Sequence, residues 1–211
     1  MSTKMLPTCA DCPFPASKKV CYRRNGKGPE NCPTISDPAT CNLGPESFED
    51  NQEMEFYLKS VEGSGVLTPR LMETVDFAKR MNYSKLGIAF CGGLRNEAKK
   101  ISAFFKGHGF EVYSAICKIG RNNKSQLVSN IDKKEAKQTL CNPIGQAELL
   151  NNANTEFNVV VGLCVGHDSL FLKHSSAMST ILVVKDRQLG HNPIGAINTL
   201  DSYYSFLKKK E

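Results

Sequence analysis

Four short runs of strand-forming residues alternate with segments of helical periodicity, and this alternation constrains the fold more than any other feature of the sequence. The runs are KLGIAF at 85–90, FEVYSAI at 110–116, NVVVGL at 158–163 and STILVVK at 179–185. The first run leads through two glycines into a helical segment that places Leu94, Ala98, Ile101 and Phe105 on one face. The order strand, glycine turn, helix and strand predicts right-handed parallel βαβ units. We therefore expect an α/β fold, a Rossmann-like three-layer sandwich with a mostly parallel sheet.

Cysteines follow the predicted strands. Cys91, Cys117 and Cys164 come at the ends of the first three runs, and Cys141 stands just before a predicted helix. The intervals between neighbouring members of this set are 26, 24 and 23 residues, which match no zinc finger. Because the carboxyl ends of parallel strands share the edge of a sheet where ligands bind, we expect these four cysteines to form one thiolate site. The alternative for each of them is an ordinary buried cysteine in a strand.

A repeated pentapeptide marks two predicted helix starts. CNPIG at 141–145 returns as HNPIG at 191–195, with histidine in place of cysteine. In both copies, at Asn142 and at Asn192, the asparagine is a suitable N-cap and the proline that follows a suitable first helical residue. We expect the second helix to run toward the C-terminal lysines. The N-terminus of a helix stabilises an anion by about 0.3–1 kcal/mol, so a thiolate at Cys141, a metal-bound sulfide or an anionic substrate would be favoured at this edge.

Two histidines and an aspartate complete the expected edge. The segment VGHDS after the third strand supplies His167 and Asp168, and the second pentapeptide supplies His191. We expect the histidines to act as ligands or proton carriers, with Asp168 orienting His167 or capping the next helix. The alternative for either histidine is a capping or packed residue. Lys118 and Lys185, each at a strand end, are expected to be solvated or to pair with an anionic cluster or substrate.

The start of the chain is a cysteine-rich segment with little to bury. Five cysteines fall among prolines, glycines and few large apolar residues: Cys9, Cys12, Cys21, Cys32 and Cys41. A short stretch of this kind usually needs a metal to hold its shape. Cys9 and Cys12 form a C-x2-C turn, and Cys21 and Cys32 would complete four ligands for zinc or for an iron-sulfur cluster, leaving Cys41 spare. Unligated surface thiols are the alternative.

The boundary between the two expected regions follows this segment. We place a metal-binding segment at 1–45 and the Rossmann-like α/β domain at 46–211. Two helices are expected at the start of the domain, the first over 46–60. The second spans LTPRLMETVDFAKRMN, with Thr68 as N-cap and Pro69 as the first helical residue.

Composition excludes several classes of protein. The chain has 211 residues, of which 40% are hydrophobic and 23% charged, as in globular proteins. We expect a cytoplasmic protein, because the sequence shows neither a secretory signal nor an apolar stretch near the roughly 18 residues of a membrane span. Nine cysteines in that compartment suit metal ligands or reactive thiols better than disulfides. About half of the formal charge of +6 comes from the lysines at 208–210, so nucleic-acid binding is not expected.

Several stretches carry a family resemblance. GIAFCGGLRNEA, CNPIGQAELLN, GLCVGHDSLFLKHS and KDRQLGHNP, with the leading CADCP and NCPT, resemble a prokaryotic family of uncharacterised metal-binding proteins, a domain of unknown function found in archaea and anaerobic bacteria. The resemblance covers nearly the whole chain and implies metal binding, with no established reaction. The ligands that it implies are Cys9, Cys12, Cys21 and Cys32 in the N-terminal set and Cys91, Cys117, Cys141 and Cys164 in the strand-end set.

The leading hypothesis is a cytoplasmic metalloprotein. It would carry an iron-sulfur cluster of the 4Fe-4S type on the strand-end cysteines, and zinc or a second cluster at the N-terminus. If one strand-end cysteine is not a ligand, an open iron would bind a small anionic or sulfur-containing substrate, and His167 and His191 would move protons. A non-catalytic zinc or metal sensor, storage or delivery protein is the first alternative. A thiol redox protein without a cluster, in which Cys141 attacks a substrate and a neighbouring cysteine resolves the intermediate, is the second.

Overall fold

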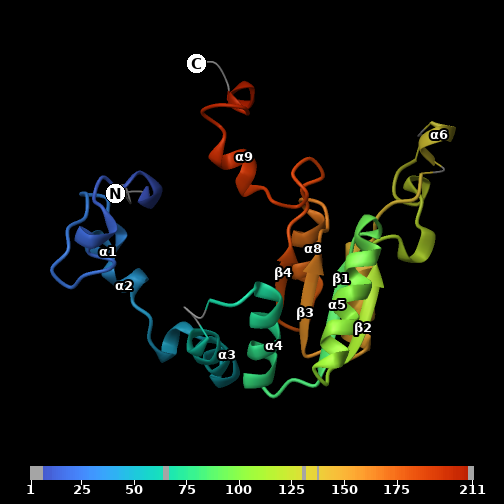
Figure 1. Cartoon of the computed structure of the whole chain (residues 1–211), viewed down its shortest axis with the longest axis horizontal. Coiled ribbons are helices and arrows are strands. Elements are labelled where there is room, and N and C mark those ends of the chain that lie inside the picture. Colours follow the sequence, from blue (N-terminus) through green and yellow to red (C-terminus); the bar gives the residue numbers. More distant parts are fainter. Residues whose placement is uncertain (1–6, 64–66, 130–131, 137, 209–211) are drawn as a thin grey trace. The chain divides into compact units, whose positions relative to one another are not determined.

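The chain folds into two compact units in a computed structural model (Figure 1). The structure describes residues 7–63, 67–129, 132–136 and 138–208. The first unit is Met1–Leu58 and the second is Lys59–Glu211. The units therefore divide at a point later than residue 45, where the sequence places the boundary.

A four-stranded sheet forms the centre of the described part of the second unit. Its strands are β1 (Lys85–Phe90), β2 (Glu111–Ile116), β3 (Phe157–Val161) and β4 (Ser179–Val183). Each pairing of these strands is parallel, as predicted, and the strands lie in the order β2-β1-β3-β4. Since β2 lies on one side of β1 and β3 on the other, the winding direction reverses between β1 and β3. In an open α/β sheet a crevice opens at this place, at the carboxyl ends of the strands.

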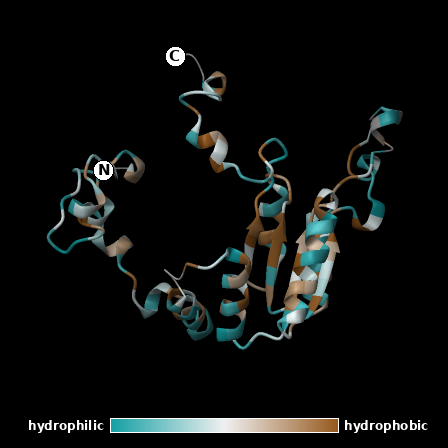
Figure 2. Cartoon of the chain, in the orientation of Figure 1, coloured by the Kyte–Doolittle hydropathy of each residue, from teal (hydrophilic) through white to brown (hydrophobic). Residues whose placement is uncertain are grey.

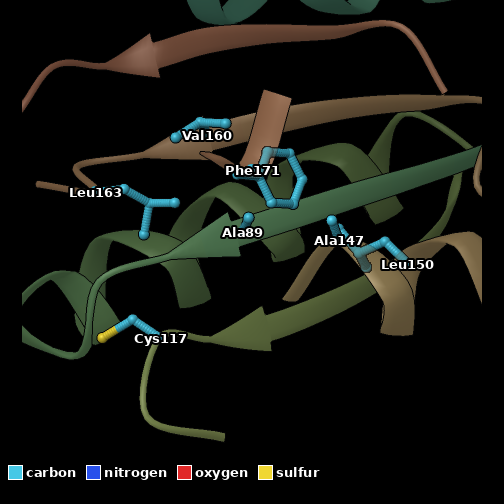
Figure 3. Packing of buried hydrophobic residues seen from close by; sticks show 7 residues of the cluster. All are labelled: Ala89, Cys117, Ala147, Leu150, Val160, Leu163 and Phe171. Carbon is cyan, nitrogen blue, oxygen red and sulfur yellow. The ribbon is translucent and has the colours of Figure 1, made fainter. Parts of the chain in front are cut away.

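Helices lie on both faces of the sheet. Those described in the second unit are α4 (Arg70–Arg80), α5 (Arg95–Gly107), α6 (Lys133–Ala136), α7 (Pro143–Asn152), α8 (His167–His174) and α9 (Ile194–Asn198). Alternate residues of a strand point to opposite faces. Phe90 of β1 lines a hollow with residues of α5, whereas Ala89 packs with Ala147 of α7 and Phe171 of α8 (Figure 3). Helix α5 therefore covers one face, and α7 and α8 cover the other.

The hydrophobic core surrounds β3, which is buried along its whole length. Figure 2 shows β3 and β4 as strongly hydrophobic strands. The apolar face of α5 predicted from its periodicity is confirmed, because Leu94, Ala98, Ile101 and Phe105 are all buried. These contacts fix the ends of β1 and β3, and with them the edge that carries the cysteines.

The two copies of the repeated pentapeptide begin different helices. Asn142 caps α7 as predicted, since its Oδ1 accepts a hydrogen bond from the N–H of Gly145 at 2.8 Å. In the second copy Pro193 takes the N-cap of α9, so the predicted roles of Asn192 and Pro193 are wrong. Helix α9 also ends at Asn198 and does not run on to the lysines. Buried residues anchor α7, whereas α9 buries none of its described residues, and so short a helix without packing is marginal.

Two other helix starts differ from the prediction. Helix α4 begins at Arg70 and its N-cap is Pro69, whose ψ of 140° is extended, so Thr68 is not the cap. Helix α3 (Asn51–Glu62) begins later than the predicted residue 46, because Pro45–Ser47 forms a separate 3₁₀ turn. Pro69 stands directly before α4, whereas Pro45 begins the separate turn that precedes α3.

The first unit consists of short turns and helices. It contains the 3₁₀ turns Cys9–Asp11 and Ala16–Lys18 and the helices α1 (Pro33–Ser36) and α2 (Pro38–Cys41), before Pro45–Ser47 and α3. No residue described between 7 and 58 is buried. At Gly26 two backbone segments lie directly against each other, because a Cβ there would lie 2.3 Å from the carbonyl carbon of Lys19. The described part of this unit therefore has no hydrophobic core.

Candidate functional site

The strand-end cysteines lie along one edge of the sheet. Cys91 directly follows β1, Cys117 directly follows β2, and Cys164 follows the end of β3 by three residues. Cys141 stands before Asn142, whose N–H donates to the carbonyl oxygen of Cys117 at 2.8 Å. The hydrogen bond attaches the start of α7 to the end of β2. Cys91 and Cys164 are thus on either side of the crevice between β1 and β3, and the predicted common edge is confirmed.

Three of the four sulfurs come together. Cys117 is buried in the cluster of Figure 3, where it lies beyond the end of its strand, and Cys91 and Cys141 pack against this cluster. The sulfurs of both of these cysteines lie close enough to Cys117 to change its electrostatic environment. The N–H of Gly92 also donates to Cys117 Sγ at 3.3 Å. The edge therefore carries a chain of three thiols in the order Cys91, Cys117, Cys141.

Lys185 contacts the sulfur of Cys91. Lys185 Nζ lies 2.6 Å from Cys91 Sγ. Burial alone would raise the pKa of Cys91, but the Lys185 ammonium, the Gly93 N–H and the Cys117 thiol together hold this pKa below its ordinary value of 9.0. Lys185 therefore contacts a protein sulfur at this edge and is not simply solvated, while its expected pairing with an anionic cluster or substrate stays a prediction.

The environment of Cys117 raises its pKa, whereas that of Cys91 lowers it. The side chain of Cys117 is 4% exposed, and burial raises its pKa to about 11, with smaller contributions from the neighbouring sulfurs of Cys141 and Cys91. The Gly92 N–H opposes this rise without cancelling it. At neutral pH, Cys117 is accordingly protonated.

Cys164 faces a different cation. Arg187 Nη2 lies 3.7 Å from Cys164 Sγ. The sequence contained a signal for this contact, because Lys185 and Arg187 are two residues apart after a strand and an extended chain points such residues to the same side. The structure therefore brings together Cys91, Cys117 and Cys141 and places Cys164 beside them with a cation of its own.

The loop that carries the two cations is held by Asp186 and His191. Asp186 Oδ1 accepts hydrogen bonds from the N–H groups two and three residues further on, at 3.0 and 2.9 Å. The Asp186 N–H in turn donates to Nδ1 of His191 at 3.1 Å, and His191 has a left-handed backbone with a φ of 68°. His191 thus closes the loop by accepting at Nδ1, so the neutral imidazole carries its N–H at Nε2 and presents it as a hydrogen-bond donor.

The remaining predicted residues have local roles. His167 is the first residue of α8, and its N–H donates to the carbonyl oxygen of Cys164 at 2.8 Å. Asp168 Oδ1 accepts from the N–H of Ser169, and the N-cap of α8 is Gly166, so the predicted capping role of Asp168 is wrong. Lys118 donates to the carbonyl oxygen of Thr139.

The N-terminal cysteines line one pocket. A hollow of about 260 Å³ in the first unit is bordered by Cys9, Cys12, Cys21 and Cys32. The side chain of Asn31, another residue of this lining, donates to Thr8 Oγ1 at 2.7 Å. A Cβ at Gly28 would lie 2.7 Å from Cys32 Sγ, so the backbone at Gly28 leaves room for this sulfur. The exposed Cys41 is not among the described residues of the lining.

Neither set forms a finished coordination sphere. Among the described residues, no group of three or more histidine, cysteine, aspartate or glutamate side chains is arranged to hold a metal ion. Separately, the described helices include none with the length and apolar character needed to cross a membrane.

Comparisons with other proteins point to one family. The family model described as "Protein of unknown function (DUF1847)" matches residues 34–182. An uncharacterized protein of Methanocaldococcus jannaschii is 47% identical over 157 residues, which cover 74% of this chain and 75% of the relative. No solved structure matches the chain. The family match contains the four strand-end cysteines and ends before Lys185.

Proposed function

From the premise that the chain belongs to the DUF1847 family of proteins of unknown function, we propose that it is a metal-binding protein with two cysteine centres. The strand-end centre, on a Rossmann-like three-layer scaffold, holds an iron-sulfur cluster. The N-terminal centre holds zinc or a second cluster. Both assignments rest on the chemistry and placement of this chain's own sulfurs.

The observation that carries the proposal is the convergence of Cys91, Cys117 and Cys141. These residues are far apart in the sequence, yet Cys117 contacts both of the others at the edge where parallel sheets bind ligands. Three thiols without a carboxylate among them form a soft donor set, which suits iron-sulfur clusters and zinc better than magnesium or calcium. Lys185 beside Cys91 would offset part of the negative charge that three thiolates and an anionic cluster bring.

The proposed centre has three protein ligands, and it requires the three side chains to turn their sulfurs toward a common point. A bound iron would supply Lewis-acid or electron-transfer chemistry at a coordination position that the three sulfurs leave free. Cys164 would approach that position from the other side of the crevice, together with Arg187. A small anionic or sulfur-containing molecule is the substrate class that these cations favour, and His191 Nε2 is available to move a proton.

The N-terminal centre is supported by a different observation. No described residue from 7 to 58 is buried, and four cysteines surround one hollow. A unit without a hydrophobic core gains its stability from elsewhere, and metal binding by thiolates is a common source in segments of this size. Four sulfurs match tetrahedral zinc, while Cys12-Pro13 and Cys32-Pro33 are also typical of cluster ligands.

A second candidate function is reversible metal storage or delivery. Cys91 and Cys141 are half-buried, so the sulfurs at both ends of the thiol chain are reachable by an incoming ion or an acceptor. In this role the centre would hold zinc or another soft ion without redox chemistry. The metal content of the purified protein distinguishes the two functions.

The test is elemental analysis and visible absorption of protein purified without oxygen. We expect a brown protein with about four iron and four acid-labile sulfide at the strand-end centre. The double variant Cys91→Ser with Cys117→Ser should lose the iron and colour, and Cys9→Ser with Cys12→Ser should lose only the N-terminal metal. Cys41→Ser is the matched control, because Cys41 is exposed and lies outside both sets. A colourless protein with zinc would favour storage, and metal-free wild-type protein would refute both functions.

A further inference from the structure

Cys91 and Cys117 are placed as the two halves of a disulfide. The β1–β2 register pairs Phe90 with Ile116, and the N–H of Cys117 donates to the Phe90 carbonyl oxygen at 2.9 Å, which continues the parallel ladder to the next pair. Cys91 and Cys117 are therefore side-by-side neighbours whose side chains share a face. Neighbouring strands lie about 4.8 Å apart, within the roughly 4.4–6.8 Å Cα separation of disulfides.

The two sulfurs differ in access and in charge partner. Cys91 is half-buried, and Lys185 Nζ lies 2.6 Å from its sulfur. Cys117 is 4% exposed and lies behind Cys91 in the chain of thiols. A molecule that approaches from solvent meets Cys91 first, while Cys117 is positioned to act on whatever Cys91 has bound.

We propose that, in the metal-free protein, Cys91 and Cys117 form a thiol–disulfide exchange pair that reduces a disulfide substrate. Cys91 is the attacking residue and Cys117 the resolving residue, which differs from an attack by Cys141. The exchange itself does not depend on the metal centre. One consequence does rest on the proposed function: oxidation of the pair removes two of three sulfur ligands, so exchange would control metal binding at the edge.

The reaction balances in two displacements. The Cys91 thiolate attacks one sulfur of a disulfide R–S–S–R, the S–S bond breaks, and a thiolate RS⁻ leaves with the electron pair. RS⁻ takes the proton of the Cys117 thiol and becomes RSH. The Cys117 sulfur then attacks Cys91 Sγ, which breaks the mixed disulfide and releases a second RS⁻. The protein loses two electrons in forming the Cys91–Cys117 disulfide, and the substrate gains them.

The test uses full-length protein that has been stripped of metal with a chelator, reduced and mixed with glutathione disulfide. Tryptic peptides analysed by mass spectrometry locate the adducts, since Cys91 and Cys117 fall in different peptides. We expect glutathione on Cys91 first and then a Cys91–Cys117 crosslink. Cys117→Ser should stop at the adduct on Cys91, and Cys91→Ser should slow glutathione release at this edge about tenfold or more.

Two lysine variants separate a thiolate effect from a general loss of charge. Lys185→Met should slow the first adduct about tenfold, because it removes the cation beside the attacking sulfur. Lys118→Met carries the same change in charge at a strand end, but its ammonium contacts the carbonyl oxygen of Thr139, so it should leave the rate unchanged. Equal rates in the two variants, a first adduct on Cys141, or a Cys117–Cys141 crosslink would each overturn the proposal.

The outcomes also separate this proposal from the metal centre. Protein that forms the Cys91–Cys117 crosslink but retains neither iron nor zinc after oxygen-free purification supports the exchange pair and refutes the metal function. Protein that retains metal, yet after stripping leaves Cys91 unmodified by glutathione disulfide, refutes the exchange pair alone.

Discussion

Replacing Gly162 with alanine should be among the most damaging single-methyl changes at the strand-end edge. Gly162 follows β3 with a φ of +60°, and an added Cβ would lie 2.1 Å from Leu94 Cδ1. The left-handed backbone costs a residue with a Cβ about 1–2 kcal/mol. Forcing a methyl into the packed side chain of Leu94, which is 7% exposed, adds about 1–3 kcal/mol. We therefore expect Gly162→Ala to lower the free energy of unfolding by about 2–5 kcal/mol.

The matched control is Gly190→Ala. Gly190 has a nearly identical φ of +58°, but a Cβ there would meet no described atom within 4 Å. It should lose only the backbone contribution of about 1–2 kcal/mol. Urea unfolding of both variants, followed by far-ultraviolet circular dichroism, gives the difference directly. Equal losses would show that Leu94 moves aside without cost and would refute the packing explanation.

Three further experiments test the N-terminal ends of secondary elements and the N-terminal pocket. Asn142→Ala should cost about 1 kcal/mol in urea unfolding and Asn192→Ala almost nothing, because only the first copy of the pentapeptide caps its helix; equal costs would contradict this. Burial favours a higher pKa for Glu156, but the N–H and hydroxyl donors at the start of β1 hold this pKa below 4.5 in the folded protein. The ionised carboxylate therefore stabilises the fold above pH 4.5, and this stabilisation is lost as the pH falls through the lower folded pKa. Glu156→Gln should therefore reduce stability by about 1–2 kcal/mol at neutral pH and much less in acid, as thermal unfolding across pH would show. Gly28→Ala should displace the sulfur of Cys32 and reduce N-terminal metal content relative to Cys41→Ser; unchanged content would contradict this placement of Cys32 in the centre.

The sequence predicts the sheet and its edge well because both follow from short-range patterns. Runs of apolar residues with a glycine turn and a helix between them specify a parallel crossover, and each cysteine is then placed by its distance from a strand end. The buried face of α5 likewise needs only the helical period. Cys91 and Cys117 could be assigned to one edge on this basis before any contact was known.

The details that the sequence did not predict depend on contacts between distant residues. Asn142 and Asn192 hold the same position in the two copies of the pentapeptide, but only α7 has a core to pack against, so only Asn142 becomes an N-cap. The division of the thiols into three plus one depends on which cation each sulfur meets. Arg187 reaches Cys164 from a loop whose shape depends on the left-handed backbone of His191. The periodicity of apolar residues in the sequence does not predict a left-handed backbone at this position.

Gly162 links the fold of the edge to its chemistry. Lys185 follows β4, whereas Cys91 follows β1, and β3 lies between these strands, so the lysine side chain must cross the end of β3 to reach the sulfur. A Cβ at Gly162 would lie 3.9 Å from Lys185 Cε, which shows that the lysine passes directly over this position. A larger side chain there would block the crossing and also press on Leu94 at the start of α5. Gly162 therefore lies directly under the path by which a cation from β4 reaches the sulfur of Cys91, so the packing of this glycine and the contact between the two side chains are coupled.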